Sequence, residues 1–215
     1  MKGGILIIFL IGIQTITFSQ RKLKWDEFSI MVGNGFYTFT YKDIESINDL
    51  NQKYTSGYCF QANVRTRWKW KNYFNFHVTM NQAGAKSISA GNLMEWNLNY
   101  LNFGSSYRYK IIDNETRDKW SINVGPILQV GYLMSGIQNV NTLSYDLKKT
   151  DAFLDWVLSG GINVEAHFIA THRLNLKINY QFDYSFTQIE GNDADIGQRT
   201  RNLGHLLSIG AGFNL

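Results

Sequence analysis

The stretch from Ser208 to Leu215 reads S-I-G-A-G-F-N-L and is the last part of the sequence. Apolar side chains occupy every second position, and the positions between them hold small or polar residues, namely Ser208, Gly210, Gly212 and Asn214. Successive side chains of a β-strand point to opposite faces. The stretch therefore predicts a strand with one apolar face and one polar face.

Such a strand suits a wall with lipid outside and a polar lumen inside. It is typical of the closing strand of an outer-membrane β-barrel, and its predicted signal is made of Ser208, Gly210, Phe213 and Leu215. We expect the barrel assembly machinery to read this signal during insertion. We also expect the last two of these residues to face lipid, and Gly210 and Gly212 to leave room in the lumen beside Arg65 or Arg67.

The other end of the chain predicts export. Lys2 precedes a mostly apolar run from Ile5 to Ile16, and Ser19 offers a small residue before Gln20. These features are typical of a secretory signal peptide, so we expect residues 1–19 to be removed near Ser19/Gln20 and residues 20–215 to form one domain. The alternative is an uncleaved anchor, but the run is shorter than the roughly 20 residues that span a bilayer.

The composition agrees with a membrane barrel. Beyond the signal segment no run of about 18 apolar residues occurs, so no transmembrane helix is expected. The 12 Tyr, 14 Phe and 6 Trp suffice for aromatic girdles at two interfaces. The single cysteine, Cys59, excludes an internal disulfide. The formal charge of +4 is mild and spread along the chain, which gives no case for a nucleic-acid partner.

Eight amphipathic stretches follow the signal segment. They run from Glu27 to Tyr41, Tyr58 to Trp68, Tyr73 to Asn81, Glu95 to Lys110, Trp120 to Tyr132, Asp155 to Phe168, Arg173 to Thr187 and Leu203 to Leu215. Short connections at 69–72, 111–118 and 169–172 alternate with longer ones at 42–57, 82–94, 135–152 and 188–202. This predicts an all-β fold, an eight-stranded antiparallel up-and-down transmembrane β-barrel with short periplasmic turns and long outer loops.

A soluble barrel of lipocalin type is the main alternative, because it alternates in the same way with its apolar side chains inside. Three features favour the membrane. The apolar faces carry no charge over five or six stretches, the opposite faces carry several charges, and the last strand has the closing pattern.

With these stretches in place, the chain resembles the PorT-like outer-membrane β-barrel domain family. The resemblance lies in FHVTMNQAGAK from Phe76 to Lys86, YLNF from Tyr100 to Phe103, Gly125-Pro126 followed by Leu133-Met134, Gly160-Gly161 and the final strand. Asn102 and Gly104 depart from the family's usual glutamate and proline. The resemblance implies the barrel and its location. Some members take part in type IX secretion and gliding, but most have no assigned activity, so no activity is carried over.

Charged side chains on the polar faces are expected inside the lumen. They are Arg65, Arg67, His77, Arg108, Glu165, His167, Lys177 and Asp183. An eight-stranded barrel is filled by side chains rather than open. Buried charges need partners. We therefore expect these residues to form an internal salt-bridge network with a structural role.

The sequence offers little for catalysis. Acyl transfer needs a nucleophile, a base and an orienting acid within hydrogen-bond reach. The candidate bases are His77, His167, His172 and His205, and none has a serine in a pattern typical of lipid-modifying barrels. No pair has metal-ligand spacing on one strand. We therefore expect no catalytic residues, no cofactor and no metal.

The leading hypothesis is a non-enzymatic integral protein of the cell outer membrane with a structural or accessory role. Its expected partners are outer-membrane lipid, the assembly machinery and a protein partner in a secretion or surface complex. One alternative is an accessory component of type IX secretion, gliding or another surface-assembly complex. A second alternative is a lipid A-modifying outer-membrane enzyme.

Overall fold

The computed structural model describes residues 25–42, 53–69, 71–89, 91–114, 119–150, 152–189 and 199–215. The predicted signal peptide lies outside these residues, as do most of the predicted loop at 42–57 and the acidic part of the loop at 188–202. Both therefore stay predictions. No helix in the described part of the chain is long and apolar enough to cross a membrane.

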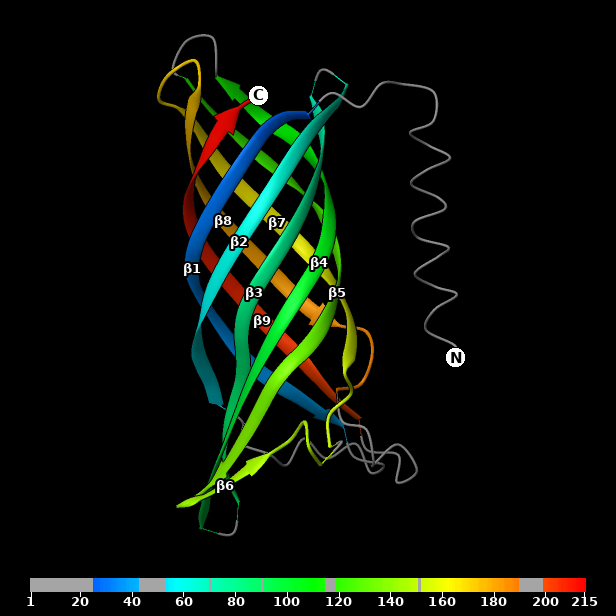
Figure 1. Cartoon of the computed structure of the whole chain (residues 1–215). Coiled ribbons are helices and arrows are strands. Elements are labelled where there is room, and N and C mark those ends of the chain that lie inside the picture. Colours follow the sequence, from blue (N-terminus) through cyan, green and yellow to red (C-terminus); the bar gives the residue numbers. More distant parts are fainter. Residues whose placement is uncertain are drawn as a thin grey trace.

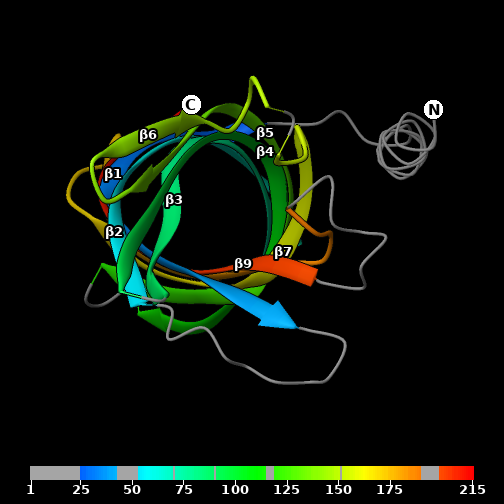
Figure 2. The ribbon, with the colours of Figure 1, turned by 90° about the horizontal axis from the view of Figure 1, so that it is seen from below.

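Nine antiparallel strands make up the regular structure of the described residues. They are β1 (Trp25–Lys42), β2 (Lys53–Lys69), β3 (Asn72–Ser89), β4 (Asn92–Asn114), β5 (Trp120–Val140), β6 (Leu143–Asp146), β7 (Trp156–Ile169), β8 (Leu174–Ser185) and β9 (Arg199–Asn214). Eight of them form a ring, in which β4 pairs with β5, β5 with β7 and β9 with β1 (Figures 1 and 2). Within the described part of the chain, the four-residue β6 pairs with β5 alone and lies outside the ring. The predicted eight-stranded antiparallel barrel is confirmed.

The strands cross the barrel wall at an angle. Directly opposed residues lead from Ile30 through β2, β3, β4 and β5 to Leu158 on β7. Opposed residues followed from Ile30 in the other direction, through β9 and β8, lead to Phe168. This residue lies ten positions further along β7 than Leu158. A closed barrel needs such a stagger, which corresponds to a strand tilt of roughly 40°. Because of the tilt, side chains that meet across the lumen come from distant points of the sequence.

Two predicted loops are wrong in detail. Residues 82–94 were expected to be a loop, but β3 continues to Ser89 and β4 begins at Asn92. Gly91, with φ of 79°, lies in the tight connection between them. Likewise β5 continues to Val140, and β6 lies within the predicted loop at 135–152. The reason is that side-chain alternation persists beyond the apolar belt, where small and polar residues weaken its signal.

The two faces of the wall differ in polarity along most of the barrel. Outward apolar side chains such as Ile30, Val78 and Ile178 are exposed, whereas their inward neighbours, such as Asn63 and Asn179, are buried. This is the inverse of a soluble core, as the sequence predicts.

The end of the lumen nearest β6 is different. There a buried apolar cluster fills the interior, and it includes Phe39, Cys59, Leu98, Leu133 and Leu206. Leu147, Phe153 and Ile189 also belong to it, and Ala152 packs against it. The lumen is thus polar along most of its length and closed by an apolar cluster at one end.

Candidate functional site: a charged cluster in the lumen

Glu165 on β7 is the centre of the charged cluster. Its carboxylate accepts hydrogen bonds from the guanidinium groups of Arg65 on β2 and Arg108 on β4. The Nζ atom of Lys177 on β8 lies 3.9 Å from the same carboxylate. All four side chains are buried. The tilt of the strands brings these residues together, although 112 positions separate the first from the last.

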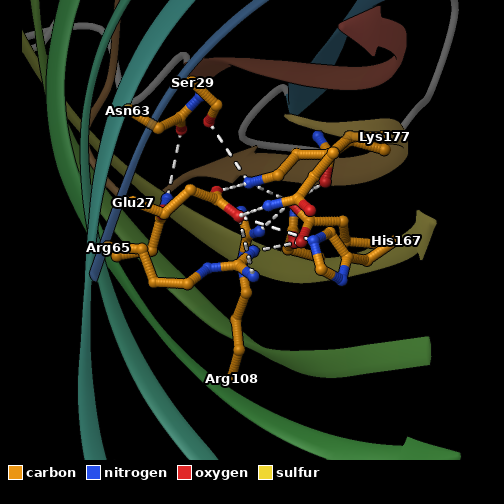
Figure 3. A network of polar contacts seen from close by, with 12 residues as sticks. Glu27, Ser29, Asn63, Arg65, Arg108, His167 and Lys177 are labelled. Atoms are coloured by element: carbon orange, nitrogen blue, oxygen red, sulfur yellow. Dashed lines mark hydrogen bonds and ion pairs between the residues drawn. The ribbon is translucent and has the colours of Figure 1, made fainter. Parts of the chain in front are cut away.

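Glu27 on β1 provides the second carboxylate. Its Oε1 accepts a hydrogen bond from Nζ of Lys177, and its Oε2 lies 3.9 Å from Nη1 of Arg65 and 3.5 Å from Nε2 of His167. Figure 3 shows Glu27 between these three side chains. Glu27 was not among the predicted lumen residues. Alternation with the outward Phe28 would have placed it there.

The position of Arg67 differs from the predicted one. It was predicted inside the lumen, but its side chain is exposed at the rim, and Thr66 is buried instead. Its guanidinium lies 5.8 Å from the centre of the Tyr73 ring. The pairing of β2 with β3 shifts register between Arg67 and Lys69. Arg67 itself pairs with the buried Tyr73 and lines a cavity at this end of the lumen, so it keeps the inward parity, and its place at the end of the barrel leaves its side chain exposed.

His77 and Asp183 lie in the lumen but belong to a separate polar group. The His77 ring is 3.4 Å from Oε1 of Gln129. The Asp183 carboxylate accepts hydrogen bonds of 3.2 Å from Gln129 and 2.8 Å from Gln181. Among the described residues Asp183 has no ion pair within 4.0 Å. The structure therefore divides the eight predicted residues into a charged cluster, an amide-linked group and one rim residue.

The closing strand lies where the sequence placed it. β9 pairs with β1 on one side and β8 on the other, which completes the ring. Ser208 faces the lumen and is buried, whereas Phe213 and Leu215 are exposed. The atoms nearest to the lumen side of Gly212 belong to Glu27 and Lys177, and those nearest to Gly210 belong to β1. The space expected for Arg65 or Arg67 is thus taken by other residues.

One serine lies near a lumen histidine. Oγ of Ser121 is 3.5 Å from Nδ1 of His167, whose other ring nitrogen faces Glu27. Ser121 is 0% exposed. The other histidines lie elsewhere. His172 is in the turn between β7 and β8, and His205 accompanies Tyr180 on the outward face. Among the described residues no three His, Cys, Asp or Glu side chains form a metal site.

Solved structures with the same architecture are known. Neisserial surface protein A is similar with 10% identity and a TM-score of 0.52, over 87% of this chain and 97% of its own. OprG from Pseudomonas aeruginosa is similar with 12% identity and a TM-score of 0.51, over 90% and 97%. A major outer membrane protein from Thermus thermophilus is similar with 14% identity and a TM-score of 0.52, over 88% and 99%.

The chain has the fold of the small outer-membrane β-barrels. At these identities the likeness concerns the fold alone. The sequence matches no protein-family model and no curated protein.

Proposed function

We propose that this protein is an integral barrel of the outer membrane with a non-enzymatic structural or accessory role. The observation that carries the proposal is the inverted polarity of the wall. Large apolar side chains are exposed around the ring, while Arg65, Arg108, Glu165 and Lys177 are buried inside it. In water such a belt favours association with other apolar surfaces, whereas in a bilayer it is solvated by lipid chains.

The belt also has the composition of a membrane-facing surface. Exposed aliphatic residues such as Val32, Ile162 and Ile209 lie within their strands, and exposed aromatic residues such as Trp25, Trp156 and Phe168 lie at or near strand ends, while Phe60 and Phe103 lie midway along β2 and β4. Aromatic side chains at the two interfaces and aliphatic ones between them are typical of outer-membrane barrels. The outward ion pair of Lys86 with Glu95 lies beyond the belt, on the extended part of β3 and β4.

A matched pair of substitutions tests membrane residence. Ile178→Arg places a charge in the middle of the belt and should destabilise the lipid-inserted barrel by about 2–4 kcal/mol. Ile88→Arg, on the extension of β3, should cost less than about 1 kcal/mol, although both isoleucines are similarly exposed, at 55% and 58%. Unfolding by urea in lipid vesicles measures both values. Equal, small costs would contradict the proposal.

Cell fractionation and gel mobility give an independent test. We expect enrichment in outer-membrane fractions and a band that migrates differently before and after heating, because a closed barrel resists detergent until it unfolds. Recovery of the folded protein as a soluble periplasmic species would overturn the proposal.

The absence of catalysis is also part of the proposal. Its support is the complete burial of Ser121 beside His167. A fluorophosphonate probe should leave the folded protein unlabelled, and deletion of the gene should leave lipid A acylation unchanged. Labelling that is lost in Ser121→Ala would overturn this part and favour the enzyme alternative.

A role in a secretion or surface complex is the second candidate. Its supports are the resemblance to the PorT-like family and the strand β6, which has exposed side chains and, among the described residues, one unpaired edge. Exposed strand edges are sites at which another chain adds a strand. Deleting residues 142–145 should then reduce co-purification of the partner and secretion of cargo. Unchanged secretion in a strain that carries this deletion would count against the candidate.

A further inference from the structure

A small cavity of about 30 Å³ adjoins Asp183 on β8, inside the ring. Every strand of the ring except β2 contributes to its lining. Part of the lining belongs to the apolar cluster, namely Tyr37, Ala83, Tyr100 and Val157. The cavity therefore lies where the polar part of the lumen meets that cluster. Because roughly 10–15 Å³ of such space already holds a water molecule, it has room for a particle of that size.

Asp183 carries a charge that its surroundings do not compensate. Among the described residues that line the cavity, it is the only charged one. It is 7% exposed, and no cation of the described residues lies within 4.0 Å of its carboxylate. Its Oδ2 accepts hydrogen bonds from Gln129 and Gln181, which are neutral. Since a buried carboxylate is unfavourable without a positive partner, these two amides leave most of the cost unmet.

The lining is rich in oxygen atoms that accept and poor in donors. Nδ2 of Asn81 donates to Tyr37 over 2.6 Å, and Nδ2 of Asn102 donates to Asn81. These amide nitrogens are thus engaged with other lining residues. In contrast, Oδ1 of Asp183 and Oδ1 of Asn202 are buried and have no hydrogen bond within the described residues. Buried polar atoms normally have a partner, so two such oxygens in one lining indicate a ligand that presents positive charge to them.

We propose that this cavity binds a monovalent alkali-metal cation, with Oδ1 of Asp183 and Oδ1 of Asn202 as ligands. The hydroxyl groups of Ser159 and Ser185 line the same cavity and offer further oxygen atoms. Hard cations are bound in proteins by carboxylate and amide oxygens of this kind. One carboxylate matches one positive charge, whereas a divalent ion would leave an excess charge buried in the lumen.

A proton on Asp183 is the competing means of neutralising the carboxylate. A proton, however, needs neither a cavity nor several oxygen atoms around it, and both are present here. From the sequence we expected no metal, because no two histidines have ligand spacing on one strand. Oxygen ligands that come from β8 and β9 leave no such pattern. The site lies inside the ring, so it does not depend on the proposed role of the protein.

Thermal unfolding of the whole protein in detergent tests the proposal. The solutions contain the chloride of Na⁺, K⁺ or N-methylglucamine at equal ionic strength and fixed pH, and the last cation is too large for a cavity of about 30 Å³. We expect Na⁺ or K⁺ to raise the unfolding temperature above its value in the organic salt. A ligand of the folded state should add roughly 3–5 °C for each tenfold rise in concentration above its dissociation constant.

Two variants place the effect at this cavity. Asp183→Asn removes the charge at nearly constant size and should abolish the difference between the alkali-metal and organic salts. Asn202→Ala removes the second ligand oxygen and should raise the cation concentration needed for half of the effect about tenfold, which gives a readout even if Asp183→Asn does not fold. The control is Glu95→Gln, which removes a partly exposed carboxylate on the outward face and should keep the full difference.

Three results would overturn the proposal. The first is an equal unfolding temperature in all three salts. The second is an alkali-metal effect that persists unchanged in Asp183→Asn or in Asn202→Ala. The third is an unfolding temperature that depends on pH in the same way in every salt, which would identify a proton as the counter-charge of Asp183.

Discussion

Glu165 shows, at the scale of a single residue, how the lumen tolerates its charges. Two guanidinium groups hydrogen-bond to its carboxylate, and a third cation lies close by. Each ion pays a desolvation cost on burial, and mutual attraction offsets that cost only while all partners are present. The cluster is therefore sensitive to the loss of any one member.

Replacing this carboxylate should be strongly destabilising. Glu165→Gln leaves Arg65 and Arg108 with a weaker acceptor, so we expect a loss of about 3–5 kcal/mol in the free energy of unfolding. The control is Glu95→Gln, which breaks the partly exposed 3.0 Å pair with Lys86 and should cost less than about 1 kcal/mol. Urea unfolding in lipid vesicles, followed by tryptophan fluorescence, measures both. Similar losses in the two variants would contradict this account.

At the scale of elements, the hairpin of β5 and β6 depends on one turn residue. Asn141 has φ of 53°, and its side chain accepts a 3.0 Å hydrogen bond from the backbone N–H of Leu93 and donates a 2.7 Å bond to Asn92. It thereby joins the hairpin to the start of β4. Asp146 ends β6, and the backbone N–H of Lys149 lowers the pKa of its carboxyl group.

Substitutions at Asn141 should loosen this hairpin in a defined order. Asn141→Gly keeps the left-handed backbone but loses the side-chain hydrogen bonds, whereas Asn141→Ala also adds backbone strain of about 1–2 kcal/mol. Limited proteolysis of the hairpin should be slowest in the wild type, faster with glycine and fastest with alanine. The barrel should stay intact by gel mobility. Equal cleavage rates in all three proteins would refute the role of this residue.

The closing strand carries a second prediction at this scale. If the assembly machinery reads β9, Phe213→Ala should lower the amount of folded protein in cells several-fold, while unassisted folding into lipid vesicles changes little. Phe103→Ala on β4 is the matched control, because both phenylalanines are 49% exposed. Equal effects of the two variants in cells would show that lost apolar surface, rather than a signal in β9, explains the result.

At the scale of the whole molecule, two clusters of side chains fill the lumen. The charged cluster fills it near the start of β1 and the end of β9, and the apolar cluster with Leu98 and Leu133 fills it toward β6. Between them Asn81 donates to Tyr37 over 2.6 Å and accepts from Asn102. Interiors of eight-stranded barrels are narrow enough for side chains to fill them.

This filling predicts that the protein does not conduct ions. Purified protein inserted into planar bilayers should give no steady current above the baseline, whatever the sign of the applied voltage. Insertion must be verified in the same preparation by the heat-dependent gel shift. Stable conductance steps would contradict a lumen closed at both ends.

Much of the wall was predictable because its signal is local. The faces of β3 and β8 follow the alternation that the sequence shows at Asn75, His77, Lys177 and Asn179. The ends of the strands were less predictable, since the outward positions of β3 beyond Met80 are Gln82, Gly84 and Lys86, which lack the aromatic or aliphatic signal that marks the belt. The exposure of Arg67 was not predictable from alternation, because Arg67 keeps the inward parity opposite the buried Tyr73 and only its place at the end of the barrel leaves it exposed.

The sequence by itself determined the number of strands in the ring, most of its inside and outside faces and the closing position of β9, because an amphipathic strand is encoded by neighbours two positions apart. Only the tertiary structure decided which lumen residues meet. The ten-residue stagger of the closed ring brings Glu27, Arg65, Arg108 and Lys177 around Glu165 and leaves Asp183 with amides. That stagger is a property of all eight pairings at once, so no single stretch of sequence contains it.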